Sequence, residues 1–458
     1  MTSSTLMISV SGMRGIVGTD LTPELISRHA AALGAWARGS GRPLVVLGRD
    51  SRTSGAMFAR AAAAGLMSAG ADVIDLGIVP TPTVQLAVEH HHAGAGLILT
   101  ASHNPIEWNA LKFVGPDGIF LDGEAGAAVR ELARSGPDRA RWDGVGTVRE
   151  DAAAIDRHLE LVLALPQLDR AALRKRRFKV ALDCVRGAGG TTIPRLLESL
   201  GCEVAAINLE IDGRFPHPPE PVPENLGDLG QLVRDSKADI GMAVDPDVDR
   251  LALVDETGRP IGEDYTLAFA VRGVLGGRRD GETEGRRATV VANLSTSRVV
   301  EDAAVASGAR FLRAPVGEAN VARMIRDEHA VIGGEGNGGV ILPSVHIGRD
   351  APIGVALVLE FLRRSGQSVS AIVSNAPQYV IVKAKAPRGP DLAPVYAGLR
   401  KRFPDAESDD RDGLRLAWAD RWVHARPSGT EPIVRFIAEA PTRAEAEALV
   451  EACRSIFR

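Results

Sequence analysis

The sequence predicts an α/β protein with three similar mixed-sheet α/β domains and a C-terminal α+β domain around a central active-site cleft. Two observations predict this: a strand–helix–strand pattern occurs three times, and the last part of the chain lacks it. A length of 458 residues suits several domains of ~150 residues each. The domains we expect cover 1–155, 156–256, 257–372 and 373–458.

Composition narrows the class of partner. Hydrophobic residues make up 45% and charged residues 24% of the chain, which is typical of a globular protein with an ample core. The net charge of −4 predicts no nucleic-acid or membrane-surface partner. The three scattered cysteines predict neither a disulfide framework nor a zinc site. Because no signal peptide or membrane span is evident, we expect a cytoplasmic protein.

The chain opens on a glycine-rich stretch, 11–20, which holds one cation, Arg14. Glycines let backbone amides approach an anion closely, so this stretch is either an anion-facing loop or an ordinary turn. Thr22 then caps a helix that begins at Pro23.

The repeated unit is a strand, a helix and a second strand, joined by a crossover that is almost always right-handed. Its three copies are expected at 44–47, 55–68 and 71–76; at 179–182, 193–200 and 203–209; and at 289–292, 298–306 and 309–313. Copies so far apart in the chain indicate repeated domains and not solenoid units.

After each unit, another apolar strand ends in an unusual loop. These loops read A-S-H-N-P at 101–105, D-P-D-V-D-R at 245–250 and G-G-E-G-N-G-G at 333–339. Ligands of open α/β sheets bind at the carboxyl ends of strands, so the three loops are expected to converge on one cleft. Ser102 is then either a nucleophile that its neighbours activate or a serine that satisfies a turn.

The second loop is a candidate metal site. Asp245, Asp247 and Asp249 repel one another and need a cation, for which hard oxygen ligands favour Mg²⁺ or Ca²⁺. An EF-hand is excluded because Arg250 stands where that loop needs glycine. An acidic turn without a metal is the alternative.

The C-terminal region is expected to hold strands at 379–384, 414–418 and 433–438, and a helix after a capping box at Thr442. The loop 424–432 between the last two strands is a candidate phosphate cradle, without the P-loop pattern. Its expected phosphate-binding residues are Arg426, Ser428, Gly429, Thr430 and Arg435. Proline-rich stretches at 216–223 and 386–394 are expected to be surface loops without a function of their own.

T-A-S-H-N-P, D-P-D-V-D-R, G-E-G-N-G-G and R-P-S-G-T-E-P, in this order, resemble the motifs of the α-D-phosphohexomutase superfamily. It contains phosphoglucomutases, phosphomannomutases and phosphoglucosamine mutases, and the resemblance covers essentially the whole chain. It implies four domains around a central cleft. It also implies that Ser102 carries a phosphoryl group, primed by a hexose 1,6-bisphosphate, and that Mg²⁺ is held by Ser102, Asp245, Asp247 and Asp249.

In the implied reaction, the phosphoserine donates its phosphoryl group to a hexose phosphate, the bisphosphosugar turns over, and the other phosphate returns to the serine. The residues at matching active-site positions are Arg14, His103, Lys112 and Arg250, with Glu335 and Asn337 at the sugar ring. One departure is Gly339, where many members have a histidine. The proton-transfer role then falls to His103, Lys112 or Arg14.

The substrate we expect is glucosamine phosphate, because the small residues of the third loop resemble a phosphoglucosamine mutase-like branch. Phosphoglucomutase/phosphomannomutase activity is the alternative. From other classes, we weigh a phosphatase in which an aspartate accepts the phosphoryl group and a non-catalytic sugar-phosphate sensor. The oligomeric state is expected to be monomer or homodimer.

Overall fold

The first sheet is mixed and has seven strands. The computed structural model describes residues 6–9, 12–276, 287–389, 391–428 and 433–457. The sheet order is β1-β2-β6-β5-β3-β4-β7, and β5, β3, β4 and β7 are parallel to one another. The strands are β1 (Met7–Ser9), β2 (Gly12–Ile16), β3 (Leu44–Arg49), β4 (Asp72–Ile78), β5 (Ala95–Leu99), β6 (Trp108–Val114) and β7 (Val148–Glu150).

Helices cover both faces of this sheet, because its central strands are apolar on each side. Helices α1 (Pro23–Gly39), α2 (Gly55–Ser68) and α4 (Gly123–Ser135) bury their apolar residues in one core cluster, and α3 (Thr81–His90) belongs to the other. Thr22 caps α1 by accepting a hydrogen bond from the Leu25 amide, as predicted.

The second and third sheets repeat the same strand order. They run β11-β10-β8-β9 and β15-β14-β12-β13, and the matching part of the first sheet is β6-β5-β3-β4. The strands are β8 (Lys179–Asp183), β9 (Glu203–Ile207), β10 (Ile240–Val244), β11 (Leu251–Val254), β12 (Thr289–Asn293), β13 (Arg310–Ala314), β14 (Ile332–Glu335) and β15 (Gly339–Ile341). The loops after β5, β10 and β14 are therefore structurally equivalent.

One continuous core joins the second and third sheets, so these two units form a single packed body. Helix α12 is buried along most of its length in that core. The helices of this region are α5 (Ala154–Leu163), α6 (Arg170–Arg176), α7 (Ile193–Ser199), α8 (Gly227–Ser236), α9 (Asp264–Leu275), α10 (Arg298–Ala306), α11 (Glu318–Asp327) and α12 (Ala351–Ser365).

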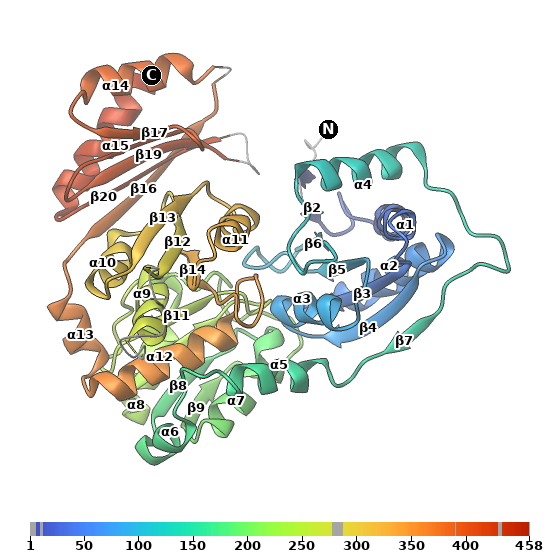
Figure 1. Ribbon diagram of the computed structural model, residues 1–458, viewed down its shortest axis with the longest axis horizontal. Helices are drawn as coiled ribbons and strands as arrows, with labels where there is room; N and C mark the ends of the chain where they lie inside the picture. The colour runs from blue at the N-terminus through green and yellow to red at the C-terminus, as the bar shows by residue number, and fades with distance from the viewer. Residues whose placement is uncertain (1–5, 10–11, 277–286, 390, 429–432, 458) are drawn as a thin grey trace.

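The fourth sheet is antiparallel, has its own core and lies apart from the first sheet, on the far side of the third (Figure 1). Helix α13 (Val369–Asn375) leads into it, and its order is β16-β20-β19-β18-β17. Its elements are β16 (Val380–Pro387), α14 (Ala393–Arg402), β17 (Glu407–Asp409), β18 (Leu414–Ala417), β19 (Trp422–Pro427), β20 (Ile433–Ala440) and α15 (Arg443–Phe457). The predicted fold class, three α/β units and a C-terminal α+β unit, is confirmed.

Three local predictions are wrong. The glycine-rich opening does not form a loop over 12–16, since those residues form β2 and their backbone pairs with β6. Glu335 is the last residue of β14 and not part of the following loop. Residues 424–427 belong to β19, so the expected C-terminal loop begins later than predicted.

Among the described residues, no helix is both long enough and apolar enough to cross a membrane.

Candidate active site

The structurally equivalent loops meet at one cleft of about 490 Å³. Residues from the first three sheets line it, and the motif residues among them are Arg14, Ser102, His103, Lys112, Arg250, Glu335 and Asn337. Asp245, Asp247 and Asp249 lie fully buried beside it. The structure therefore brings together the catalytic, metal-binding and sugar-binding residues that the sequence predicts.

Ser102 lies in the turn after β5 and has a backbone φ of 49°, in the left-handed region that is strained for a residue with a side chain. Its hydroxyl donates a hydrogen bond to Asp245 Oδ2 over 2.8 Å and lies 3.3 Å from His103 Nδ1. Its amide donates to Thr100 Oγ1. The strained turn thus points the hydroxyl at the carboxylate cluster.

Arg52 fixes this turn through hydrogen bonds to its backbone. Its guanidinium donates to Asp50 Oδ2 and to four backbone carbonyls, at 2.6–3.1 Å. Those carbonyls belong to Ser102, Asn104, Pro105 and Trp108. Because Arg52 is fully enclosed, these charge-assisted bonds fix the backbone around Ser102.

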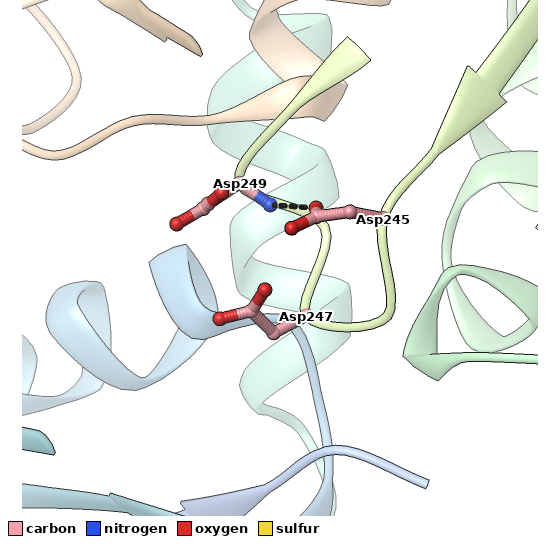
Figure 2. Close-up of side chains that lie close together, drawn as sticks. All are labelled: Asp245, Asp247 and Asp249. Atoms are coloured by element: carbon pink, nitrogen blue, oxygen red, sulfur yellow. Dashed lines mark hydrogen bonds between the residues drawn. The ribbon is translucent and has the colours of Figure 1, made fainter. Parts of the chain in front are cut away.

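The three aspartates project to the same side of the loop between β10 and β11 (Figure 2). One carboxylate oxygen of each lies within 4.8 Å of one oxygen of each of the others. The amides of Asp249 and Arg250 both donate to Asp245 Oδ1, so the loop wraps around that carboxylate.

This cluster fits a divalent cation. Asp247 Oδ1 and Asp249 Oδ1 are buried without a hydrogen-bond donor anywhere in the described parts of the chain. Burial and the neighbouring Asp249 and Asp247 hold the pKa of Asp245 well above its usual range. Unpaired buried oxygens and a carboxyl that resists ionisation both indicate a local shortage of positive charge. An ion with hard oxygen ligands would supply that charge.

Protein cations and a hydroxyl compensate part of the negative charge. Lys112 Nζ lies 2.7 Å from Asp247 Oδ2 and 4.0 Å from Asp249 Oδ2. Burial opposes the charge of Lys112, but these two carboxylates outweigh it and raise the pKa of the amine. Thr81, at the start of α3, donates its hydroxyl to Asp247 Oδ2 and its amide to the Asp247 carbonyl. The metal loop is thereby attached to the first sheet's domain.

His103 is held in its neutral form. The positive charge of Arg250, burial and the charge of Arg14 place its pKa well below the usual range. Its Nε2 faces Glu220 Oε1 at 3.8 Å, and Arg250 approaches the same oxygen at 3.5 Å. Glu220 lies in the proline-rich stretch 216–223, so the prediction that this stretch lacks a function of its own conflicts with its contacts at the site.

Glu335 and Asn337, which the sequence predicts at the sugar ring, are held by hydrogen bonds. Glu335 accepts from Asn293 and from the Gly317 amide through Oε1, and from Arg349 through Oε2. Asn337 accepts from the Gly339 amide. Both residues line the cleft.

Of the predicted phosphate-binding residues, the three that the structure describes, Arg426, Ser428 and Arg435, belong to the fourth domain and do not line this cleft. Arg426 on β19 pairs in register with Arg435 on β20, and Arg426 Nε donates to Asp412 Oδ2 over 2.9 Å. Ser428 is buried after the end of β19. Gly429 and Thr430 lie outside the described residues.

Sequence reasoning missed three residues of the site: Arg52, Glu220 and Arg349. Arg52 stands in the polar R-D-S-R-T-S-G segment between β3 and α2, a composition typical of any turn. Arg349 directly precedes Asp350, the N-cap of α12, a pattern typical of any helix start. No local signal indicates that Arg52 and Glu220 contact Ser102 and His103, or that Arg349 lines the cleft.

Comparison with known proteins agrees with this architecture. Family models for phosphoglucomutase/phosphomannomutase match the chain in order: α/β/α domain I at residues 6–139, domain II at 156–258, domain III at 263–379 and the C-terminal domain at 381–456.

Individual relatives match over nearly the full length. A phosphoglucomutase/phosphomannomutase of Thermococcus kodakarensis is 38% identical over 96% of both chains. A probable phosphoglucosamine mutase of Methanopyrus kandleri is 36% identical over 98% of this chain and 97% of the relative.

Among solved structures, a phosphoglucomutase/phosphomannomutase family protein from Burkholderia thailandensis has a TM-score of 0.86 at 27% identity. It covers 100% of this chain and 98% of its own. The superfamily resemblance is thus confirmed, and with it an isomerase of the phosphohexomutase type. The chain belongs to the phosphoglucomutase/phosphomannomutase family.

Proposed function

We propose that this phosphohexomutase interconverts glucosamine 6-phosphate and glucosamine 1-phosphate through a phosphoserine at Ser102. The observation that carries the phosphoserine is the strained turn that aims the Ser102 hydroxyl at Asp245, 2.8 Å away, at the edge of the cleft. A serine that merely satisfied a turn would bond within its own loop and not to a carboxylate of the second sheet's loop.

The covalent step follows from these positions. The bond between phosphorus and Ser102 Oγ breaks as a bond between phosphorus and a sugar hydroxyl oxygen forms. The sugar hydroxyl passes its proton to a base, and this base returns a proton to the departing Ser102 Oγ. We assign this base to His103, whose Nδ1 lies 3.3 Å from Ser102 Oγ. Lys112 is engaged with Asp247, and an arginine such as Arg14 does not release its proton.

Asp245, Asp247 and Asp249, together with the phosphorylated Ser102, are the residues we assign to Mg²⁺. When bound, the ion neutralises charge on the transferring phosphoryl group. Arg250 and Lys112 line the same cleft and add positive charge to it. We further propose that a hexose 1,6-bisphosphate primes the serine.

The other end of the bisphosphosugar needs a second anion site. We assign it to Arg426, Ser428, Gly429, Thr430 and Arg435 of the C-terminal domain, with the ring held by Glu335 and Asn337. The domain boundaries 1–155, 156–256, 257–372 and 373–458, a cytoplasmic location and a monomer or homodimer complete the proposal.

The sugar is the least constrained part. The G-E-G-N-G-G sequence of the third loop resembles that of a phosphoglucosamine mutase-like branch, which supports an amine at C2. The relatives carry both names, phosphoglucosamine mutase and phosphoglucomutase/phosphomannomutase, so overlap between sugars is expected. One polar contact is worth about 1–3 kcal/mol, or one to two decades in selectivity.

The test is kcat/KM for the 1-phosphates of glucosamine, glucose and mannose on one preparation. Glucosamine 1-phosphate is expected to rank first. A tenfold or greater preference for glucose or mannose phosphate would contradict the glucosamine assignment and favour phosphoglucomutase/phosphomannomutase activity. Release of inorganic phosphate as the main product would instead favour a phosphatase. Tight binding without turnover would favour a sensor.

A further inference from the structure

Arg349 connects three carboxylates that come from different parts of the cleft. Its NH2 group lies 2.6 Å from Asp249 Oδ2, its NH1 group 2.9 Å from Glu335 Oε2 and its Nε 3.1 Å from Glu318 Oε2. Its amide also donates to Glu318 Oε1. The side chain is 9% exposed and lines the cleft. One guanidinium therefore joins the aspartate loop between β10 and β11 to the end of strand β14 and the start of helix α11.

The contact to Asp249 divides the roles of that carboxylate. Oδ2 accepts the Arg349 hydrogen bond, whereas Oδ1 is buried without a hydrogen-bond donor in the described part of the chain. Arg349 thus fixes Oδ2, whereas Oδ1 has no hydrogen bond and lies 3.7 Å from Arg250 Nε, which leaves it open to a metal cation. A planar guanidinium can hold several carboxylates in set directions, which the ammonium group of a lysine cannot do.

Gly339 makes room for this arrangement. A Cβ atom on Gly339 would lie 2.2 Å from Arg349 Cδ and 2.9 Å from Arg349 Cγ. Non-bonded carbons do not approach that closely, so a side chain at position 339 and the observed position of Arg349 exclude each other. The aliphatic part of Arg349 occupies the space into which a side chain at 339 would project.

We propose that Arg349 is a positioning residue of the mutase reaction. It orients Asp249 toward the metal and fixes Glu335 at the same time, so that the metal and the sugar ring keep a fixed position relative to each other. Gly339 is the residue that permits it. The proposal rests on the metal role of Asp249 in the proposed function.

Metal affinity of the unphosphorylated protein, without sugar, is the primary measurement, made by calorimetry with Mg²⁺ and with Mn²⁺. Partners that orient a metal ligand typically contribute about 10–100-fold to affinity or activity, so Arg349→Met is expected to weaken metal binding by about tenfold or more. It should also raise KM for the sugar phosphate and lower kcat. Arg349→Lys is expected to recover less than half of the lost affinity on a logarithmic scale.

The matched control is Arg310→Met. Arg310 lies on β13 of the third sheet, is 54% exposed and pairs with Glu328 on the surface. This variant should bind metal and turn over substrate like the unchanged protein. Metal affinity and KM of Arg349→Met that match those of Arg310→Met would overturn the proposal.

Gly339→Ala keeps the test informative if Arg349→Met fails to fold, because it leaves Arg349 in the chain, and unchanged metal affinity in this single variant would overturn the proposal. Gly339→Ala should weaken metal binding while Arg349 is present, because the new methyl group displaces it, and should have little further effect beside Arg349→Ala. An equal loss from Gly339→Ala in both backgrounds would overturn the proposed pairing. Asp247→Asn distinguishes a failure of the metal site from a failure of the Arg349 proposal. Unchanged metal binding in that variant refutes the metal site itself.

Discussion

Replacing Arg52 with methionine tests whether the Ser102 turn is held by one buried cation. The substitution keeps most of the side-chain volume but removes every side-chain N–H that now reaches Asp50 and the four backbone carbonyls. The Arg52 amide and the Thr100 hydroxyl still donate to Asp50, but they carry no positive charge. Removing one partner of a buried ion pair costs about 3–5 kcal/mol, because the remaining charge stays buried and unpaired. We expect a loss of that size in the stability of the first domain.

Activity should fall as well, for a separate reason. The left-handed backbone of Ser102 is strained by about 1–3 kcal/mol and persists only if its surroundings fix it. Without the bonds to the carbonyls of Ser102 and Asn104, the turn can relax and move the hydroxyl. A misplacement of about 1 Å can reduce turnover by about 100-fold, which is the expected fall in kcat.

Hydrogen exchange of the β5 and β3 amides is the appropriate assay, because a chain of several domains does not unfold in one step. The control is Arg134→Met in the same domain, where the arginine is 76% exposed and pairs with Glu131 on the surface. Its protection should be unchanged. A stability loss below about 1 kcal/mol in Arg52→Met would refute the reasoning, since it would mean that the buried charge of Asp50 needs no partner.

Three further predictions follow from the site and its surroundings. Asp247→Asn should lose metal-dependent activity while keeping its thermal unfolding midpoint within a few degrees, and full activity in excess chelator would contradict the metal assignment. Burial raises the pKa of Asp264 to about 8, so this carboxyl binds a proton in the folded state that it releases on unfolding. Stability should therefore fall by up to about 1.4 kcal/mol per unit as the pH rises from about 4 to 8, and Asp264→Asn should flatten this slope in pH-dependent denaturation. The C-terminal domain should close on the cleft when the sugar binds, as small-angle scattering would detect, and identical profiles with and without saturating bisphosphosugar would count against closure.

The repeated architecture could be predicted from sequence because it depends on short-range patterns. Apolar runs such as 240–244 mark the buried strands, and an alanine-rich helix such as α2 follows from its own residues. The loops at the strand ends could be predicted for the same reason, and the repeated strand order brings them together. Ser102 and the three aspartates were therefore accessible to sequence reasoning.

The errors arose where tertiary pairing overrides local preference. Gly12–Ile16 is glycine-rich, yet it forms a strand that pairs with β1 on one side and with β6 on the other. Residues 424–427 directly precede the turn-forming sequence S-G-T-E-P, yet their backbone pairs with strand β20. Propensity carries no information about a partner strand that lies elsewhere in the chain.

Polar contacts between residues far apart in the chain could not be predicted from the sequence for a related reason. Arg52 bonds to carbonyls about fifty positions later, and Arg349 meets Asp249 exactly one hundred positions earlier in the chain. An isolated arginine most often lies on a solvated surface, so its residue type gives no indication of such contacts. These residues became visible only once the loops were placed in space.

The central claim is that Ser102 carries the phosphoryl group, and mapping the phosphate tests it most directly. The protein would be incubated with glucose 1,6-bisphosphate, digested and examined by mass spectrometry, with and without hydroxylamine, which cleaves acyl phosphates and spares phosphate esters. The account predicts a stable phosphate on Ser102 that hydroxylamine does not remove. Ser102→Ala should lack this phosphate and should lose nearly all mutase turnover. Phosphate on Asp245 or Asp247, or none on Ser102 after treatment, would contradict it.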